Sequence, residues 1–271
     1  MLVVVGVVTG SGGSRWRYEY LSIRREETRA FLKLIWTVMS EIRMIESTNY
    51  KGVQMNKNNK SLRLTERDIE YITWIAEQQA VRLDTLQLLF EIRGKKIDPR
   101  ALRRLVERWQ RLGLVQKKIL LAKSPSIIWP TIEGMRVANL PLSRGDRNYT
   151  PSFSSVHHTV ATARVRIEYE KRGWEWTCER DLRHEFGASH LADGLASVDT
   201  QRILVEVERT QKESSRLKHI MMANLRTKNI TGCHYWTTDA LYPVIQSNIN
   251  MLENDLKSKM QIFLLPDEVK L

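Results

Sequence analysis

The spacing of apolar positions predicts three consecutive helices in the first clearly patterned part of the chain. Thr65 and Asp68 resemble a capping box, and apolar residues at helical spacing follow them. A second helix is expected to begin near Asp84. The third opens with an aspartate followed by a proline at residues 98–99, which is typical of a helix start, and it ends at Gly113.

Two strand-like stretches follow the third helix, at residues 114–123 and 127–130, and a Ser-Pro-Ser turn separates them. Three helices and a hairpin make up a winged helix-turn-helix domain, which we expect over residues 61–140, with a closing helix at residues 131–140. In such a domain the third helix enters the major groove of DNA and the hairpin touches the neighbouring backbone.

The third helix separates apolar from basic side chains. At about 100° per residue, Leu102, Val106 and Trp109 share one side of the helix, and arginines project from the other. A solvated helix face is the alternative interpretation of such a pattern. Arginines on one face can contact phosphates only, so no base sequence is predicted. The residues that we expect to contact DNA are Arg100, Arg103, Arg104 and Arg111 on the helix, and Lys117, Lys118 and Lys123 on the hairpin.

Residues 141–155 are rich in turn-forming residues and are expected to be a linker, so a second domain is predicted over residues 156–271. Its pattern gives the order α-β-β-β-α-β with a trailing helix and strand, and the whole chain is therefore assigned to the α+β class. The expected helices begin at His157 and occupy residues 215–228 and 242–257. The expected strands occupy residues 174–178, 191–195, 202–207, 234–237 and 261–265.

Carboxylates recur at the ends of the predicted strands. Glu206 and Glu208 share one face of a strand, because successive side chains alternate between faces. Asp193 comes from the preceding strand, and Glu179 ends the strand before that one. Oxygen ligands suit Mg²⁺ or Mn²⁺, and such an ion polarises a phosphate and activates water. Asp193 and Glu206 are the candidate metal ligands, and phosphodiester hydrolysis is the chemistry suggested; an alternative is that both are satisfied polar strand ends.

The chain carries 43 Lys and Arg against 31 Asp and Glu, a net charge of +12 over 271 residues. Sixteen basic and nine acidic residues lie between residues 60 and 140, so about +7 of that charge falls in the predicted winged helix. A surplus of this size favours a polyanionic partner, and its position favours double-stranded DNA over an acidic membrane surface.

Cysteine usage indicates the compartment. Cys178 and Cys233 are far apart in the sequence and lie in strand-like, aromatic surroundings, so we predict two buried free thiols and a reducing, cytoplasmic environment. The histidines and cysteines do not show the spacing of a zinc site.

Residues 1–60 are expected to be a poorly integrated extension. Residues 1–8 are apolar but too short to span a bilayer, and no basic residue or cleavage pattern indicates a signal peptide. Glycines at residues 10–13 predict a flexible turn, since no Gly-Lys-Ser/Thr follows them. A helix is expected at residues 31–45, followed by a polar linker. Our hypothesis is that translation starts at Met55.

A resemblance can be stated from these residues. The α-β-β-β-α-β order, with Asp193 on one strand and Glu206-Val-Glu208 on the next, is similar to the PD-(D/E)xK core of restriction-type endonucleases. From about residue 61 the chain resembles the replication-relaxation family of plasmid and integrative-element proteins. The resemblance implies a role on mobile DNA, in plasmid replication, relaxation or transfer, together with replication or transfer proteins. The motifs on which this resemblance rests are Thr131-Ile-Glu-Gly134, His158, His190-Leu-Ala-Asp-Gly194 and Val205-Glu-Val-Glu-Arg-Thr210 followed by Lys212.

Two positions depart from the nuclease pattern. Ala192 stands where proline precedes the aspartate, and Glu208 stands where a lysine helps to activate the attacking water. Lys212 could replace that lysine, with Glu208 as an extra ligand; equally, Glu208 could belong to a structural ion network with Lys212 or nearby arginines. We expect weak or absent cleavage, because Glu208 adds negative charge where a phosphate must approach.

Three functions stay open. The first is a DNA-binding accessory protein whose nuclease-like domain is degenerate; the second is an active divalent-metal nuclease; the third is a winged-helix transcriptional regulator with a dimerisation or sensing domain. A homodimer is compatible with all three. The basic helix at residues 215–228, which carries Arg216, Lys218, Arg226 and Lys228, favours the first.

Overall fold

The computed structural model describes residues 2–5, 19–22, 64–120, 124–142, 150–186 and 192–269. The chain forms two compact units, Met1–Ser61 and Leu62–Leu271. In the first unit, strand β1 (Leu2–Val5) pairs antiparallel with β2 (Glu19–Ser22), a pairing that the sequence did not predict. The turn expected at residues 10–13, the helix expected at residues 31–45 and Met55 lie outside the described residues.

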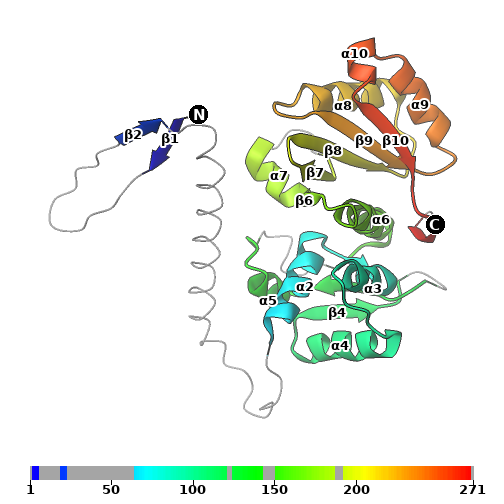
Figure 1. The fold of residues 1–271 in the computed structure, drawn as a ribbon. Helices are drawn as coiled ribbons and strands as arrows, with labels where there is room; N and C mark the ends of the chain where they lie inside the picture. Colours follow the sequence, from blue (N-terminus) through cyan, green and yellow to red (C-terminus); the bar gives the residue numbers. More distant parts are fainter. Residues whose placement is uncertain are drawn as a thin grey trace. The chain divides into compact units, whose positions relative to one another are not determined.

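The second unit begins with helices and a small antiparallel sheet in alternation (Figure 1). The strands lie in the order β3-β5-β4, so the first short strand pairs with the last one of the hairpin. The three helices, the hairpin and the closing helix were predicted; strand β3, only two residues long, was not. The elements are α2 (Glu66–Glu77), β3 (Val81–Arg82), α3 (Leu83–Ile92), α4 (Pro99–Arg111), β4 (Val115–Lys118), β5 (Ile127–Pro130) and α5 (Ile132–Val137).

Local capping explains where two of these helices start. The Thr65 side chain accepts a hydrogen bond from the Asp68 backbone N–H at 3.2 Å, and Asp68 Oδ2 accepts one from the Thr65 N–H at 2.9 Å. The predicted capping box is therefore confirmed. At α4, Asp98 Oδ1 accepts from the backbone N–H of Arg100 at 2.8 Å, with proline in the first turn.

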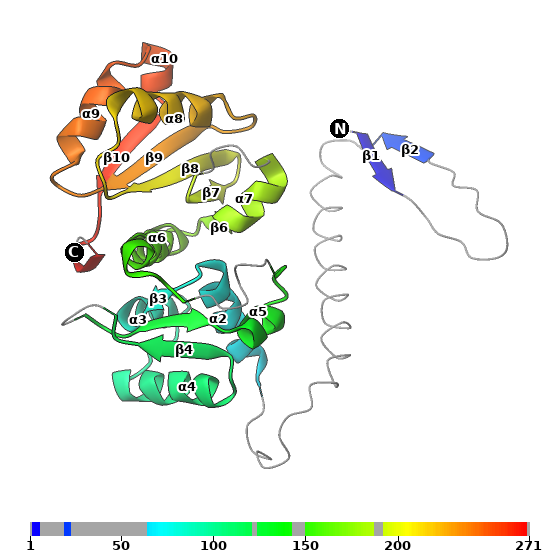
Figure 2. The same ribbon diagram turned by 180° about the vertical axis from the view of Figure 1, so that it is seen from behind.

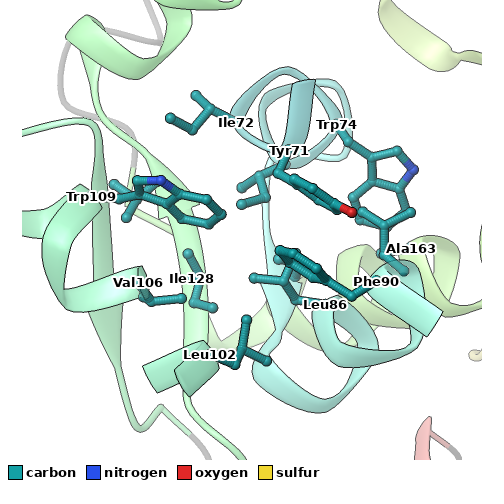
Figure 3. Close-up of a cluster of buried hydrophobic side chains, with 14 of the residues drawn as sticks. Tyr71, Ile72, Trp74, Leu86, Phe90, Leu102, Val106, Trp109, Ile128 and Ala163 are labelled. Carbon is teal, nitrogen blue, oxygen red and sulfur yellow. The ribbon is translucent and has the colours of Figure 1, made fainter. Parts of the chain in front are cut away.

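One apolar core holds these helices together (Figure 3). Tyr71 of α2 stacks on Phe90 of α3, with ring centroids 3.8 Å apart. Helix α4 contributes Leu102, Val106 and Trp109, each at most 1% exposed. Ala163, from a helix later in the chain, closes the same core.

That later helix, α6, opens the remaining part of the unit, which is built around a five-stranded sheet in the order β10-β9-β8-β7-β6. Strand β7 pairs antiparallel with both β6 and β8, whereas β8, β9 and β10 run parallel to one another. The elements are α6 (Phe153–Glu170), β6 (Glu175–Cys178), α7 (Glu179–Phe186), β7 (Gly194–Val198), β8 (Gln201–Glu208), α8 (Ser214–Arg226), β9 (Gly232–Thr237), α9 (Tyr242–Asn250), α10 (Asn254–Lys257), β10 (Met260–Leu264) and the 3₁₀ turn η2 (Asp267–Val269).

Helices cover both faces of this sheet. On one face, Val165 and Tyr169 of α6 pack against Val205 of β8. On the other face, α8 and α9 pack against the side chains that alternate with these, including Leu204 and Tyr235. Helix α6 also contributes Ala163 to the core of the first three helices. It therefore lies between that bundle and the sheet, as both ribbon views show (Figure 2).

The fold is mixed α and β, as predicted, but several bounds differ. Helix α6 begins at Phe153 rather than at His157, and β7 begins at Gly194 rather than at residue 191. The helix predicted at residues 242–257 is split into α9 and α10. Helix α7 was not predicted, and Glu179, expected to end a strand, is its first residue.

The two cysteines are free and buried, as predicted. Burial raises the pKa of the Cys178 thiol to about 11, so this sulfur stays protonated and unreactive at neutral pH. Among the described residues, no helix has both the length and the apolar character needed to cross a bilayer.

Candidate functional site

The outward face of α4 is basic. Its buried side belongs to the core through Leu102, Val106 and Trp109, so the opposite side projects into solvent. Within the described part of the chain, no ion pair to an acidic side chain engages the arginines on that side. The exposed arginines are Arg100, Arg103, Arg104 and Arg111, the four that the sequence predicted as DNA contacts.

The lysines of the hairpin are less uniform. Lys118 is exposed at the end of β4, whereas Lys117 is half-buried and its Nζ lies 3.5 Å from Glu107 Oε1 of α4. Lys117 is therefore partly neutralised by a neighbour of the proposed contact surface. Lys123 lies outside the described residues.

A buried carboxylate fixes α4 in place. Asp68, at the start of α2, accepts a hydrogen bond from Trp109 Nε1 at 2.9 Å and pairs with Arg108. Desolvation raises the pKa of Asp68, but hydrogen bonds from Thr65, Trp109 and Arg108 outweigh it, so the pKa is lowered. The helix that carries the exposed arginines is thus tied to the bundle by a charge that stays ionised.

The second group of predicted residues gathers at one end of β7 and β8. Asp193, directly before β7, accepts from the Val207 backbone N–H through Oδ2 at 2.7 Å. Its other oxygen, Oδ1, accepts from His158 Nε2 of α6 at 2.8 Å. The Asp193 side chain therefore continues the β7–β8 ladder where the backbone of β7 has ended. No sequence pattern indicates the contact between His158 and Asp193, because the two residues are 35 positions apart.

Two further carboxylates lie on the adjacent strand. Glu206 is 4% exposed, and its Oε1 accepts from Asn224 Nδ2 of α8 at 2.8 Å. Glu208 is 5% exposed and forms an ion pair with Lys212. The sequence left two roles open for Lys212, a relocated catalytic lysine or a member of an ion network. In the structure Lys212 forms the ion pair with Glu208. Burial of a carboxylate is costly unless a cation pairs with it, and Lys212 supplies that cation.

The three acids surround a common region of the fold. Tyr235 is the partner of Glu206 in the parallel β8–β9 register, and its hydroxyl is buried. Burial raises the pKa of Tyr235 well above its usual value, and the charges of Glu206, Glu208 and Asp193 raise it further. The pKa of His158 is lowered by desolvation, but Asp193, Glu208 and Glu206 raise it to a net value above the usual one. Asp193, Glu206 and Glu208 are therefore close enough to act on the same groups.

Glu179 does not join them. It begins α7, is 38% exposed, and pairs with Arg183 one helical turn later at 2.6 Å. The sequence placed Glu179 at a strand end because no glycine or proline separates β6 from α7. The chain in fact turns from strand to helix directly after Cys178.

Protein groups already engage the carboxylates that were predicted to hold a Mg²⁺ or Mn²⁺ ion. The oxygens of Asp193 that a metal would use accept hydrogen bonds from His158 and Val207, and Glu206 and Glu208 are engaged by Asn224 and Lys212. Across the described ranges, no three His, Cys, Asp or Glu side chains form a group that could hold a metal. No hydrolytic step is assigned to these residues.

Comparisons with known proteins identify no relative of this chain. No family model matches the chain, no curated protein matches it and no solved structure matches it. What the chain does is therefore inferred from its own residues.

Proposed function

We propose that the chain binds double-stranded DNA through α4, with the β4–β5 hairpin beside it. The observation that carries this proposal is the row of exposed arginines on α4, opposite the side that packs into the core. The order α2-β3-α3-α4-β4-β5, with β3 paired to β5, supports a winged helix, in which the third helix inserts into the major groove.

The charge on α4 suits DNA better than a membrane surface. A helix that lies in a membrane interface buries an apolar face among the lipids. The apolar side chains of α4, such as Val106 and Trp109, are already fully buried in the protein core. Only the polar side of α4 is free to contact a partner. A phosphate backbone binds such a side through charge and hydrogen bonds, without apolar contacts.

The strand order of the five-stranded sheet supports the nuclease-like resemblance, but the arrangement of the carboxylates does not support metal-dependent cleavage. Three antiparallel strands and a parallel fourth, covered by α6 and α8, suit the predicted α-β-β-β-α-β core. Asp193 and Glu206 occupy adjoining strand positions, but their oxygens accept from protein donors. We therefore propose a degenerate, nuclease-like domain in a DNA-binding protein of a mobile element that acts in replication, relaxation or transfer.

An active nuclease is the second candidate. It is favoured by one observation, the placement of Asp193, Glu206 and Glu208 at the same end of the paired strands β7 and β8. It differs from the first candidate in requiring a divalent ion, and nicking of supercoiled plasmid in Mn²⁺ separates the two. A transcriptional regulator would share the DNA-binding surface of α4 and differ in the role of the sheet domain.

The α4 proposal is tested by fluorescence anisotropy of a labelled duplex with the full chain. Arg103→Ala combined with Arg104→Ala removes two exposed charges and should weaken binding about tenfold or more. The dependence of log affinity on log salt should become shallower by about 2, since each lost phosphate contact removes about 0.9 from the slope.

A matched control removes the same charge elsewhere. Arg136 and Arg183 are exposed and pair with a glutamate on their own helix, so Arg136→Ala combined with Arg183→Ala lowers the net charge equally. This control should bind the duplex almost as well as the unmodified chain. Equal affinity of the α4 variant and the control would overturn the proposal that α4 contacts DNA.

A further inference from the structure

A second basic surface lies on α8. The buried side of this helix, including Leu217 and Met221, packs on the sheet, and its other side is exposed. Among the described residues, none of the cations on that side pairs with a carboxylate. We call these residues the α8 surface; they are Arg216, Lys218, Arg226 and, just after the helix, Lys228.

The helices α8 and α9 offer no carboxylate to the α8 surface. The helix itself contains no acidic residue, and α9, which packs beside it, contains no charged residue at all. Glu213, directly before α8, accepts a hydrogen bond from Ser215 Oγ at 2.8 Å. Cations held on one rigid helix without acidic partners are complementary to a polyanion, and polyanion binding is the role already proposed for α4.

The two basic surfaces face away from each other. Helix α4 packs on the first core, and α6 borders that core through Ala163 and Ile167. The same α6 covers one face of the sheet, and α8 covers the opposite face. The layers therefore follow the order α4, bundle, α6, sheet, α8, as Figures 1 and 2 show. With about 8 to 10 Å between packed layers, the two helices lie roughly 30 to 40 Å apart.

The contact between the bundle and α6 is specific as well as apolar. Trp74 Nε1 donates to both carboxylate oxygens of Glu170, at 3.0 and 3.1 Å. Arg166, 7% exposed, pairs with Glu77 of α2 at 2.7 Å and lies over the Trp74 ring. Buried charges with several partners have few alternative arrangements. The two basic surfaces therefore belong to one body.

We propose that the α8 surface binds a second duplex segment, so that one chain bridges two segments of DNA. A single straight duplex cannot lie against α4 and α8 together, because their exposed sides point in opposite directions. The inference rests on the proposed function for the α4 half of the bridge, and adds the α8 half. Bridging of two segments suits a protein that brings together distant sites on a DNA element.

The test uses the full chain, a duplex fixed to beads and a second, fluorescent duplex in solution. The unmodified chain should retain the fluorescent duplex on the beads. Combining Arg216→Ala, Lys218→Ala and Arg226→Ala should reduce that capture about tenfold, while anisotropy still reports binding of a single duplex through α4. The matched control combines Lys171→Ala, Lys257→Ala and Lys259→Ala, three exposed positions outside α8, and should capture normally.

The two proposals fail in different ways. If Arg103→Ala with Arg104→Ala binds a single duplex as well as the unmodified chain, the α4 proposal is wrong. If the α8 triple variant captures the second duplex normally, the α8 proposal is wrong and bridging arises from two copies of the chain. Absence of capture by the unmodified chain, with α8-dependent binding to anionic vesicles instead, would also overturn the α8 proposal and assign this surface to membranes.

Discussion

Asp68 Oδ1 lies 2.9 Å from Trp109 Nε1, across a separation of 41 residues. Both side chains are fully buried, and Asp68 also caps α2 and pairs with Arg108. One carboxylate thus satisfies the start of α2 and an indole and a guanidinium of α4. The position of the helix that we propose to contact DNA depends on this residue.

We therefore predict that Asp68→Ala destabilises the chain strongly. The change leaves the Trp109 N–H buried without its acceptor and removes the partner of Arg108, at a cost of about 3 kcal/mol. Urea unfolding followed by tryptophan fluorescence measures this loss. Glu70→Ala is the control, because it removes an exposed partner of Arg93 and should cost less than about 1 kcal/mol. Similar costs for the two variants would contradict the role given to Asp68.

The same residue predicts a pH dependence. Its pKa is lowered in the folded state, so the unfolded state binds more protons once the pH approaches the usual aspartate value of about 3.9. The stability contributed by Asp68 is complete above that value and is lost as the pH falls through the lower, folded-state pKa. Urea midpoints measured from about pH 6 to pH 3 should fall more steeply for the unmodified chain than for Asp68→Asn. If the urea midpoints of the two proteins fell in parallel with pH, Asp68 would not be the source of the acid sensitivity.

Local features of this site could be predicted from the sequence, and long-range ones could not. The Thr65–Asp68 box depends on residues three positions apart, so the sequence alone indicates it. The bond to Trp109 and the His158–Asp193 contact depend on how separate elements pack, and no spacing signals them. Helix α7 was missed for a different reason, because residues 178–179 pass from strand to helix without a breaker.

Gly134 belongs to a sequence motif, but the reason for a glycine at this position is visible only in the structure. An added Cβ would lie 2.1 Å from the Leu114 carbonyl oxygen, because α5 packs directly on the start of the hairpin. We predict that Gly134→Ala lowers the melting temperature by several degrees, at a cost of about 2 kcal/mol, since backbone must move. Ala138→Gly, at the position directly after the same helix, should cost about 1 kcal/mol or less. A melting temperature unchanged by Gly134→Ala would contradict this packing.

The contact between the bundle and α6 can be measured by a double-mutant cycle. Trp74→Phe removes the indole N–H donor, and Glu170→Gln removes the negative charge of its acceptor. A hydrogen bond to a charged group contributes about 1.5 to 3 kcal/mol, so the coupling energy should be about 1 kcal/mol or more. The cycle Arg93→Ala with Glu70→Ala, on an exposed pair, should give a smaller coupling. Additive effects of Trp74→Phe and Glu170→Gln would indicate that the bundle and α6 are not joined as described.

The acidic strand ends give the last prediction. A ligand that binds only the folded state raises its stability by about 2.7 kcal/mol at a hundredfold excess over Kd. Because Asp193 already accepts from His158 and Val207, and Glu208 pairs with Lys212, we expect Mg²⁺ and Mn²⁺ to leave the melting temperature unchanged. Supercoiled plasmid should likewise stay intact. A rise in melting temperature that Asp193→Asn abolishes would show instead that Asp193 binds the metal. Nicking lost in Lys212→Ala would then identify an active nuclease.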